Sequence, residues 1–249
     1  KCKSNGEESG QIPWGFVKQQ KQIKSKQRVT CHGEVFTADR EVNAMLDLVK
    51  QETERIDSRF LEPACGTGNF LVKILERKLS VVKKKYRKSP LDYERNSILA
   101  LSSIYGVELL NDNVEDCQKR LYKIWEKAYK SICKTETNED VQKSARFILS
   151  KNIVCGNALS LMQVDENAKD TETPIVFSEW AIIRGNIIQR KDYTFEDLMR
   201  IGSSSNKTES TNEINEQISF STENAPSDEG KFLKQYTTDY RSLWKDEQT

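Results

Sequence analysis

Two glycines in a short turn, followed one predicted strand later by an acid, have the residue types and spacing of a ligand site in this 249-residue chain. Residues 60–71 read Phe-Leu-Glu-Pro-Ala-Cys-Gly-Thr-Gly-Asn-Phe-Leu, the order of a buried strand, a turn and a helix start. At the carboxyl end of a strand in an open α/β sheet, glycines let the backbone approach a ligand closely, and the helix N-terminus offers unpaired N–H groups. We therefore expect a small polar ligand at this turn.

The acid is Glu108, which directly follows the next predicted strand, residues 104–107. Carboxyl ends of parallel strands meet at one edge of a sheet, so Glu108 is expected beside the glycine turn, where a carboxylate can accept hydrogen bonds from both hydroxyls of a ribose. A surface glutamate without a ligand is the alternative. The interval from Gly68 to Glu108 exceeds the roughly twenty residues of a simple dinucleotide fold. We assign the excess to an insertion that includes the basic residues 83–88.

The elements that would position these residues alternate between strand and helix signals. Apolar side chains recur every three or four positions within residues 70–82 and 114–125, which predicts two helices. Short apolar runs predict strands at residues 59–61, 104–107, 153–155 and 175–177. This alternation is typical of a doubly wound α/β fold, a mostly parallel sheet with helices on both faces.

Composition and charge limit the possible functions. Hydrophobic residues make up 36% of the chain and charged residues 31%, which suits one core. A net charge of +1 is too small for a chain that coats a phosphate backbone unaided, so any nucleic-acid affinity is expected to be local or supplied by a partner. The six cysteines include no Cys-x-x-Cys pair, so neither a metal site nor a disulfide framework is expected. Without a run of about eighteen apolar residues or a signal peptide, we expect a cytoplasmic protein with no membrane span.

The predicted domain boundaries follow changes in composition. Residues 1–24 form a polar, basic N-terminal arm, which suits exposure to solvent or contact with DNA phosphates. Residues 25–201 form the ligand-binding domain. Residues 202–231, rich in Ser, Asn, Thr and Glu, are expected to be a flexible linker. The aromatic-bearing residues 232–249 are interpreted as a docking segment for another surface or, alternatively, as a segment that packs on its own domain.

The string Glu-Pro-Ala-Cys-Gly-Thr-Gly-Asn-Phe-Leu resembles motif I of adenine-N6 DNA methyltransferases, the motif that binds the methionine end of S-adenosylmethionine. Residues 32–38, His-Gly-Glu-Val-Phe-Thr-Ala, resemble motif X of the same family, a loop that closes over the cofactor. Residues 107–109 are similar to motif II, with its ribose-binding acid, and residues 155–159 to motif III, which holds the adenine ring. The resemblance covers about residues 28–200 and implies a Rossmann-like methyltransferase fold that uses S-adenosylmethionine.

The same resemblance implies a set of cofactor-binding positions and no metal ligands. In motif III, Asn157 stands where Asp is usual, and its carbonyl oxygen can still accept a hydrogen bond from the exocyclic amine of adenine. The implied cofactor-binding residues are Phe36, Thr37, Glu62, Pro63, Ala64, Cys65, Gly66, Gly68, Asn69, Phe70, Glu108, Leu109, Asn157, Ala158 and Leu159.

The family's catalytic motif IV, Asp/Asn-Pro-Pro-Tyr/Phe, is degenerate in this chain. In the family this motif holds a flipped adenine by hydrogen bonds from its amine and by stacking on the aromatic ring. Here only Gly185 and Asn186 remain of the pattern, with isoleucine at both proline positions and glutamine at the aromatic position. Asn186 is therefore the candidate catalytic residue, but efficient catalysis by this loop alone is not expected, because the rigidity and the stacking are both lost.

Three functions are compatible with this pattern. The leading hypothesis is the S-adenosylmethionine-binding subunit of a split restriction-modification DNA methyltransferase acting on adenine N6. Its partner, a second methyltransferase or specificity subunit, would supply the Pro-Pro-Tyr loop and recognise the DNA target. The alternatives are a stand-alone methyltransferase for a substrate other than DNA, with Asn186 or Glu179 as its polar contact, and a cofactor-binding scaffold without catalysis.

Overall fold

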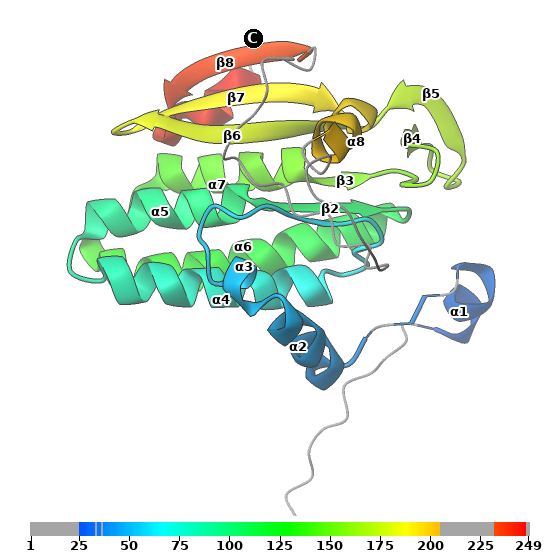
Figure 1. The fold of residues 1–249 in the computed structure, drawn as a ribbon, viewed down its shortest axis with the longest axis horizontal. Coiled ribbons are helices and arrows are strands. Elements are labelled where there is room, and N and C mark those ends of the chain that lie inside the picture. Colours follow the sequence, from blue (N-terminus) through cyan, green and yellow to red (C-terminus); the bar gives the residue numbers. More distant parts are fainter. Residues whose placement is uncertain (1–24, 33, 36, 205–231, 248–249) are drawn as a thin grey trace, which may run out of the picture. The chain divides into compact units, whose positions relative to one another are not determined.

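The computed structural model describes residues 25–32, 34–35, 37–204 and 232–247 (Figure 1). Contacts divide the chain into two units, Lys1–Ala38 and Asp39–Thr249. In the first unit, α1 (Lys26–His32) is followed by Glu34, whose carboxylate pairs with Arg28. The predicted N-terminal arm, residues 1–24, and nearly all of the predicted linker lie outside the described residues.

The second unit contains the elements that bear on function. Its helices are α2 (Asp39–Leu48), α3 (Lys50–Thr53), α4 (Asn69–Tyr86), α5 (Pro90–Ser102), α6 (Asn111–Cys133), α7 (Glu139–Asn152) and α8 (Phe195–Ser204), with two 3₁₀ helices, η1 (Lys134–Glu136) and η2 (Tyr240–Glu247). Its strands are β1 (Phe60–Glu62), β2 (Ile104–Glu108), β3 (Ile153–Cys155), β4 (Met162–Val164), β5 (Asp170–Pro174), β6 (Val176–Arg184), β7 (Ile187–Thr194) and β8 (Lys234–Asp239). None of the helices within the described part of the chain combines the length and the apolar character that crossing a membrane requires.

A parallel sheet lies at the centre of this unit, in the order β1-β2-β3. This parallel sheet and the helices that follow β1 and β2 confirm the predicted α/β class, and the remaining strands form separate antiparallel sheets. Among the described residues, β4 and β5 pair antiparallel, and β6, β7 and β8 form an antiparallel sheet of their own. The predicted strand at residues 175–177 continues to Arg184 and then reverses through a two-residue turn, and such a turn can join only antiparallel neighbours.

The two faces of the parallel sheet are covered differently (Figure 1). On one face α4 packs so closely on β2 that a Cβ added to Gly106 would lie 3.0 Å from Leu71 Cδ1. On the other face Tyr105 meets β6: its ring contacts Phe177 edge to face, with ring centroids 5.6 Å apart, and its hydroxyl donates to the carbonyl oxygen of Ser178 at 3.0 Å. Tyr105 and Gly106 are adjacent on β2, and they face opposite sides of the sheet because successive side chains of a strand point to opposite faces.

The residues between the glycine turn and Glu108 exceed a simple dinucleotide fold because they contain an additional helix, α5, and most of the basic residues assigned to an insertion belong to α4. α4 carries the basic residues as far as Tyr86, and α5 begins at Pro90 after Ser89, whose hydroxyl accepts a hydrogen bond from Asp92 N. Serine is favoured at the N-cap because its hydroxyl accepts from a backbone N–H that has no partner within the helix. Proline is favoured in the first turn because it has no backbone N–H to leave unpaired. α5 then places Ser97 against the core, where its hydroxyl accepts from Trp125 Nε1 on α6 at 3.1 Å.

Lys78, on α4, fixes the chain that enters β1. Its side chain is fully buried, and Nζ donates to the carbonyl oxygens of Arg55, Ile56 and Ser58. Burial lowers the pKa of Lys78 to about 7, while three carbonyl acceptors favour an ammonium, which has three protons to donate. The start of β1, and with it the glycine turn, is thereby fixed to α4.

The C-terminal residues pack on their own domain, which was one of the two alternatives for this segment. β8 pairs with β7, and η2 lies against α7. The buried carboxylate of Glu94, on α5, accepts hydrogen bonds from the hydroxyls of Tyr129 and Tyr240 at 2.5 and 2.7 Å, and from Arg241 Nε at 2.8 Å. One acid therefore joins α5, α6 and η2.

We predict that Glu94→Ala lowers the free energy of unfolding by about 3 kcal/mol, because it leaves the Arg241 guanidinium and two hydroxyls without their acceptor. Urea unfolding followed by circular dichroism measures the change. Glu115→Ala is the matched control, since Glu115 is exposed on α6 and pairs only with Lys119 and Asn111 among the described side chains. That control should change stability by less than about 1 kcal/mol. Equal effects of the two variants would contradict the role given to Glu94.

Candidate functional site

The glycine turn lies between the end of β1 and the start of α4. Gly66 and Gly68 have φ angles of 51° and 84°, a region that residues with a Cβ rarely adopt. A Cβ on Gly68 would also lie 2.5 Å from Cys117 Sγ of α6. Cys65 N donates to the carbonyl oxygen of Val107 at 2.9 Å, which ties the turn to β2. The predicted turn between the strand and the helix is therefore present, with both glycines in it.

Glu108, at the end of β2, holds this turn from the side. Its Oε2 accepts a hydrogen bond from Gly66 N at 2.9 Å, and its Oε1 accepts from Leu110 N at 3.1 Å and from Asn113 Nδ2 at 3.3 Å. A carboxylate offers about four acceptor positions, so three are used and one remains on Oε2. Glu108 can therefore accept one ribose hydroxyl as it stands, and a second if the long bond from Asn113 gives way.

Glu62 ends β1 at the same edge of the sheet. Burial raises the pKa of Glu62 to about 7, although a hydrogen bond from the backbone of Ala64 acts in the opposite direction. Pro63 and Ala64 are exposed beside it. A carboxyl group with a pKa near neutrality responds strongly to a nearby cation, because a positive ligand stabilises the charged form.

Cys65 itself is not a nucleophile. Its thiol is buried, and a hydrogen bond with Cys117 together with burial raises the pKa of Cys65 well above the ordinary range. Because the reactive form of cysteine is the thiolate, Cys65 stays unreactive at neutral pH. Its small side chain instead fits under the turn, 2.9 Å from where a Cβ on Gly106 would lie.

The loop after β3 joins the same edge. Gly156 N donates to the carbonyl oxygen of Glu108 at 2.9 Å. Asn157 Oδ1 accepts from Leu159 N at 3.0 Å, and Asn157 Nδ2 donates to Asp170 Oδ1 at 2.9 Å, so this amide shapes the loop and keeps one acceptor position on its oxygen. Leu159 is 96% exposed. An apolar side chain this exposed is available to cover a flat ring.

The structure brings most of the predicted cofactor-binding residues to one edge of the sheet. Those at or beside the edge are Glu62, Pro63, Ala64, Cys65, Gly66, Gly68, Asn69, Glu108, Leu109, Asn157 and Leu159. Phe70 and Ala158 pack against the hydrophobic core, so their side chains anchor the site's loops to it. Phe36 lies outside the described residues, and Thr37 belongs to the first unit, so the motif X assignment stays a prediction.

Asn186, the candidate catalytic residue, lies apart from this cluster. Leu61 and Phe177 share one cavity, and Arg59 pairs with Glu179, so β6 runs opposite in direction to β1. Asn186 follows Glu179 by seven residues, roughly 20 Å further along an extended chain, and so lies toward the amino-terminal end of the parallel sheet. It forms the β6–β7 turn with Gly185, whose φ is 57°.

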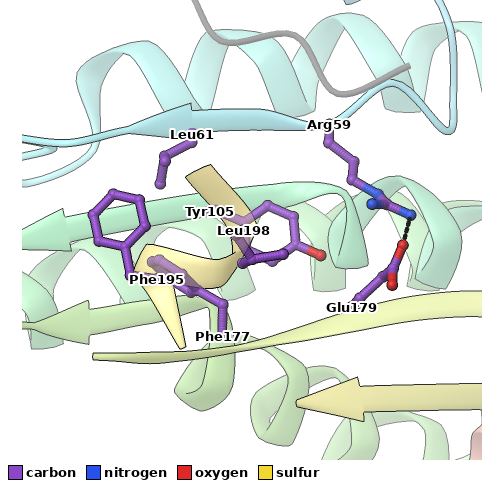
Figure 2. A pocket seen from close by; sticks show the side chains of 7 residues that line it. All are labelled: Arg59, Leu61, Tyr105, Phe177, Glu179, Phe195 and Leu198. Atoms are coloured by element: carbon purple, nitrogen blue, oxygen red, sulfur yellow. Dashed lines mark ion pairs between the residues drawn. The ribbon is translucent and has the colours of Figure 1, made fainter. Parts of the chain in front are cut away.

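Figure 2 shows the cavity between the parallel sheet and β6. Its volume is about 20 Å³, room for about one water molecule, so it cannot receive a nucleobase. At one end Arg59 and Glu179 form an ion pair at 2.5 Å, so Glu179 is already engaged. The lining residues are Arg59, Leu61, Tyr105, Phe177, Glu179, Phe195 and Leu198.

Sequence reasoning missed Arg120 on α6. Its Nη1 donates to the carbonyl oxygen of Thr67 at 2.6 Å, in the middle of the glycine turn. Nothing in the sequence distinguishes Arg120 from its neighbour Lys119, because both lie on a strongly charged helix. The contact spans 53 residues and becomes visible only once α6 is packed beside the turn.

Comparison with known proteins identifies the family. Residues 36–222, about three quarters of the chain, match the family described as MmeI, DNA-methyltransferase domain. The chain belongs to this MmeI DNA-methyltransferase domain family. The glycine turn, Glu108 and the loop after β3 all lie inside the part that matches the MmeI family.

A relative of known name gives a second similarity. The chain is 28% identical over 145 residues to a protein of Methanocaldococcus jannaschii named as a type II restriction enzyme and methyltransferase. The alignment covers 55% of this MmeI-family chain and 11% of that protein, so the chain spans about a tenth of the length of the curated relative. No solved structure matches the chain.

The raised pKa of Glu62 predicts a pH-dependent stability. Its folded-state pKa of about 7 exceeds the ordinary value of 4.5, so between these pH values the folded protein binds more protons than the unfolded chain, and stability falls as pH rises. Glu62→Gln removes this effect. We therefore expect Glu62→Gln to raise the melting temperature relative to the unchanged protein at pH 8, with a smaller difference at pH 5. Glu115→Gln, an exposed control, should show no such trend, and a trend shared by both variants would exclude Glu62 as its source.

Proposed function

We propose that this chain is the S-adenosylmethionine-binding part of a restriction-modification DNA methyltransferase that acts on adenine N6, and that a partner chain supplies the Asn-Pro-Pro-Tyr loop and recognises the DNA target. The observation that carries the proposal is the hydrogen bond from Gly66 N to Glu108 Oε2, which unites the glycine turn and the acid at one sheet edge. Membership of the MmeI DNA-methyltransferase domain family supports methyl transfer as the activity.

The residues at this edge fit such a cofactor. Because a Cβ on Gly68 would lie 2.5 Å from Cys117 Sγ and one on Gly106 would lie 2.9 Å from Cys65 Sγ, glycine at both positions lets the turn pack closely against α6 and β2. Glu108 would accept from a ribose hydroxyl through its remaining acceptor position, and Leu159 would cover the adenine ring. Glu62 would face the positive charge of the methionine portion. When bound, the cofactor supplies an electrophilic methyl group on a sulfonium leaving group, and the protein contributes alignment.

The described residues include no Asn-Pro-Pro-Tyr loop that could hold the methyl acceptor. The remnant of motif IV, Gly185-Asn186, forms a hairpin turn toward the opposite end of the sheet. The cavity of Figure 2 is too small for a base. A flipped adenine needs an amine acceptor and a stacking surface beside the transferable methyl group. These features favour a partner as the source of the catalytic loop.

The family and the named relative support DNA and restriction-modification as the context. The Methanocaldococcus jannaschii protein combines a restriction enzyme and a methyltransferase in its name, and this chain corresponds to a tenth of its length. The remaining functions of such a system would then reside outside the part that this chain resembles. A chain with net charge +1 also needs help to hold DNA, because phosphate neutralisation requires a basic surface.

Methyl transfer from labelled S-adenosylmethionine to adenine in duplex DNA tests the proposal. We expect no transfer by the isolated chain and transfer once the partner chain is added. In that mixture Glu108→Ala should lose transfer, with the Kd for S-adenosylhomocysteine at least about thirtyfold higher, because the turn and the ribose both lose a charged acceptor.

Asn186→Ala is the matched control for this experiment, and it should keep the activity of the mixture within about twofold. Circular dichroism confirms that both variants fold. Methylation of DNA by the isolated chain, or loss of transfer in Asn186→Ala, would contradict the division of labour proposed here.

A further inference from the structure

Arg120 connects α6 to the residues that would hold the cofactor. Its Nη1 donates to the carbonyl oxygen of Thr67 at 2.6 Å, to Thr67 Oγ1 at 2.9 Å and to Asn69 Oδ1 at 2.9 Å. Hydrogen bonds from a charged donor are shorter and stronger than those between neutral groups. The guanidinium therefore holds both the middle of the glycine turn and the first residue of α4.

The turn needs this restraint because of its composition. Thr67 stands between Gly66 and Gly68, and glycine loses more backbone freedom on ordering than any other residue. Glu108 holds Gly66 N, and Gly68 N donates to the carbonyl oxygen of Cys65 at 2.7 Å. Arg120 adds the restraint on Thr67. Together these contacts fix each residue of the Gly-Thr-Gly turn.

A charged residue on a helix surface commonly pairs with an acid one turn away, and the contacts of Arg120 are of a different kind. Its neighbour Lys119 forms an exposed ion pair with Glu115, one turn away on the same helix. Arg120 forms no ion pair with an acid among the described side chains, and its hydrogen bonds go instead to neutral oxygens of the turn. A contribution to helix stability therefore does not account for its position.

We propose that Arg120 is a positioning residue for S-adenosylmethionine: by holding Thr67, it keeps the glycine turn in the conformation that the cofactor meets. This inference rests on the proposed function. When a binding conformation is occupied only part of the time, the apparent Kd rises by the reciprocal of its population. Loss of Arg120 should therefore slow association, whereas dissociation changes little because the bound ligand itself holds the turn.

The test measures binding of S-adenosylhomocysteine, by calorimetry for Kd and by stopped-flow for the two rate constants. For Arg120→Met we expect Kd to rise about tenfold, mainly through slower association, as a tenfold lower population of the competent turn implies. Arg120→Lys, which keeps the charge and a donor, should recover part of the loss. Lys119→Met removes a positive charge from the adjacent position and should bind like the unchanged protein.

Three results would overturn the inference: a Kd within twofold of the unchanged protein in Arg120→Met, a loss that lies wholly in faster dissociation, or an equal loss in Lys119→Met. If Arg120→Met does not fold, Thr67→Val provides the test, because it removes one acceptor of Arg120 and should slow association about threefold. Unchanged association in both Thr67→Val and Arg120→Lys would then overturn it. If the unchanged protein does not bind S-adenosylhomocysteine, both the proposed function and this inference are contradicted. If Arg120→Met binds it normally, only this inference is contradicted.

Discussion

The carboxylate of Glu108 is the interaction on which the candidate site depends. It stands at the end of the central strand of the parallel sheet, accepts from Gly66 N of the preceding turn, and its own carbonyl oxygen accepts from Gly156 N of the following loop. Three chain segments that are far apart in the sequence therefore share one residue. Because the bonds to the carboxylate are made to a charge, they are stronger than ordinary backbone contacts, and they preorganise the edge of the sheet for a ligand.

Under the proposed function, this arrangement separates the methyl donor from the methyl acceptor. In that proposal the turn, Glu62 and Glu108 hold the sulfonium nucleoside, whereas the described residues offer no rigid aromatic loop for a base. Such a separation is physically reasonable, because the cofactor carries the reactive group and the enzyme mainly has to align the nucleophile, the methyl carbon and the sulfur. Alignment can be achieved by two surfaces that meet, provided that each is rigid on its own.

Local sequence patterns predicted the part of the fold that local interactions determine. The turn around Gly66, β1, β2, β3 and the apolar faces of α4 and α6 follow from periodicity and from glycine chemistry. Glycine followed by asparagine is both a fragment of a catalytic motif and a common hairpin turn, so Gly185-Asn186 alone does not distinguish the two, whereas the alternating strands on either side favour the hairpin. The contacts of Arg120 with Thr67 and of Glu94 with Arg241 span 53 and 147 residues, and no local pattern encodes them.

Backbone amide chemical shifts during titration with S-adenosylhomocysteine test whether the turn and Glu108 bind the cofactor, because the shifts report every affected residue at once. We expect saturable shifts concentrated at residues 62–69, 108–113 and 155–159, with Gly66 among the largest. Residues 184–187 of the hairpin should be unaffected. Shifts centred on the cavity between Arg59 and Leu198, or no shifts at millimolar ligand, would show that the turn and Glu108 do not form the cofactor site.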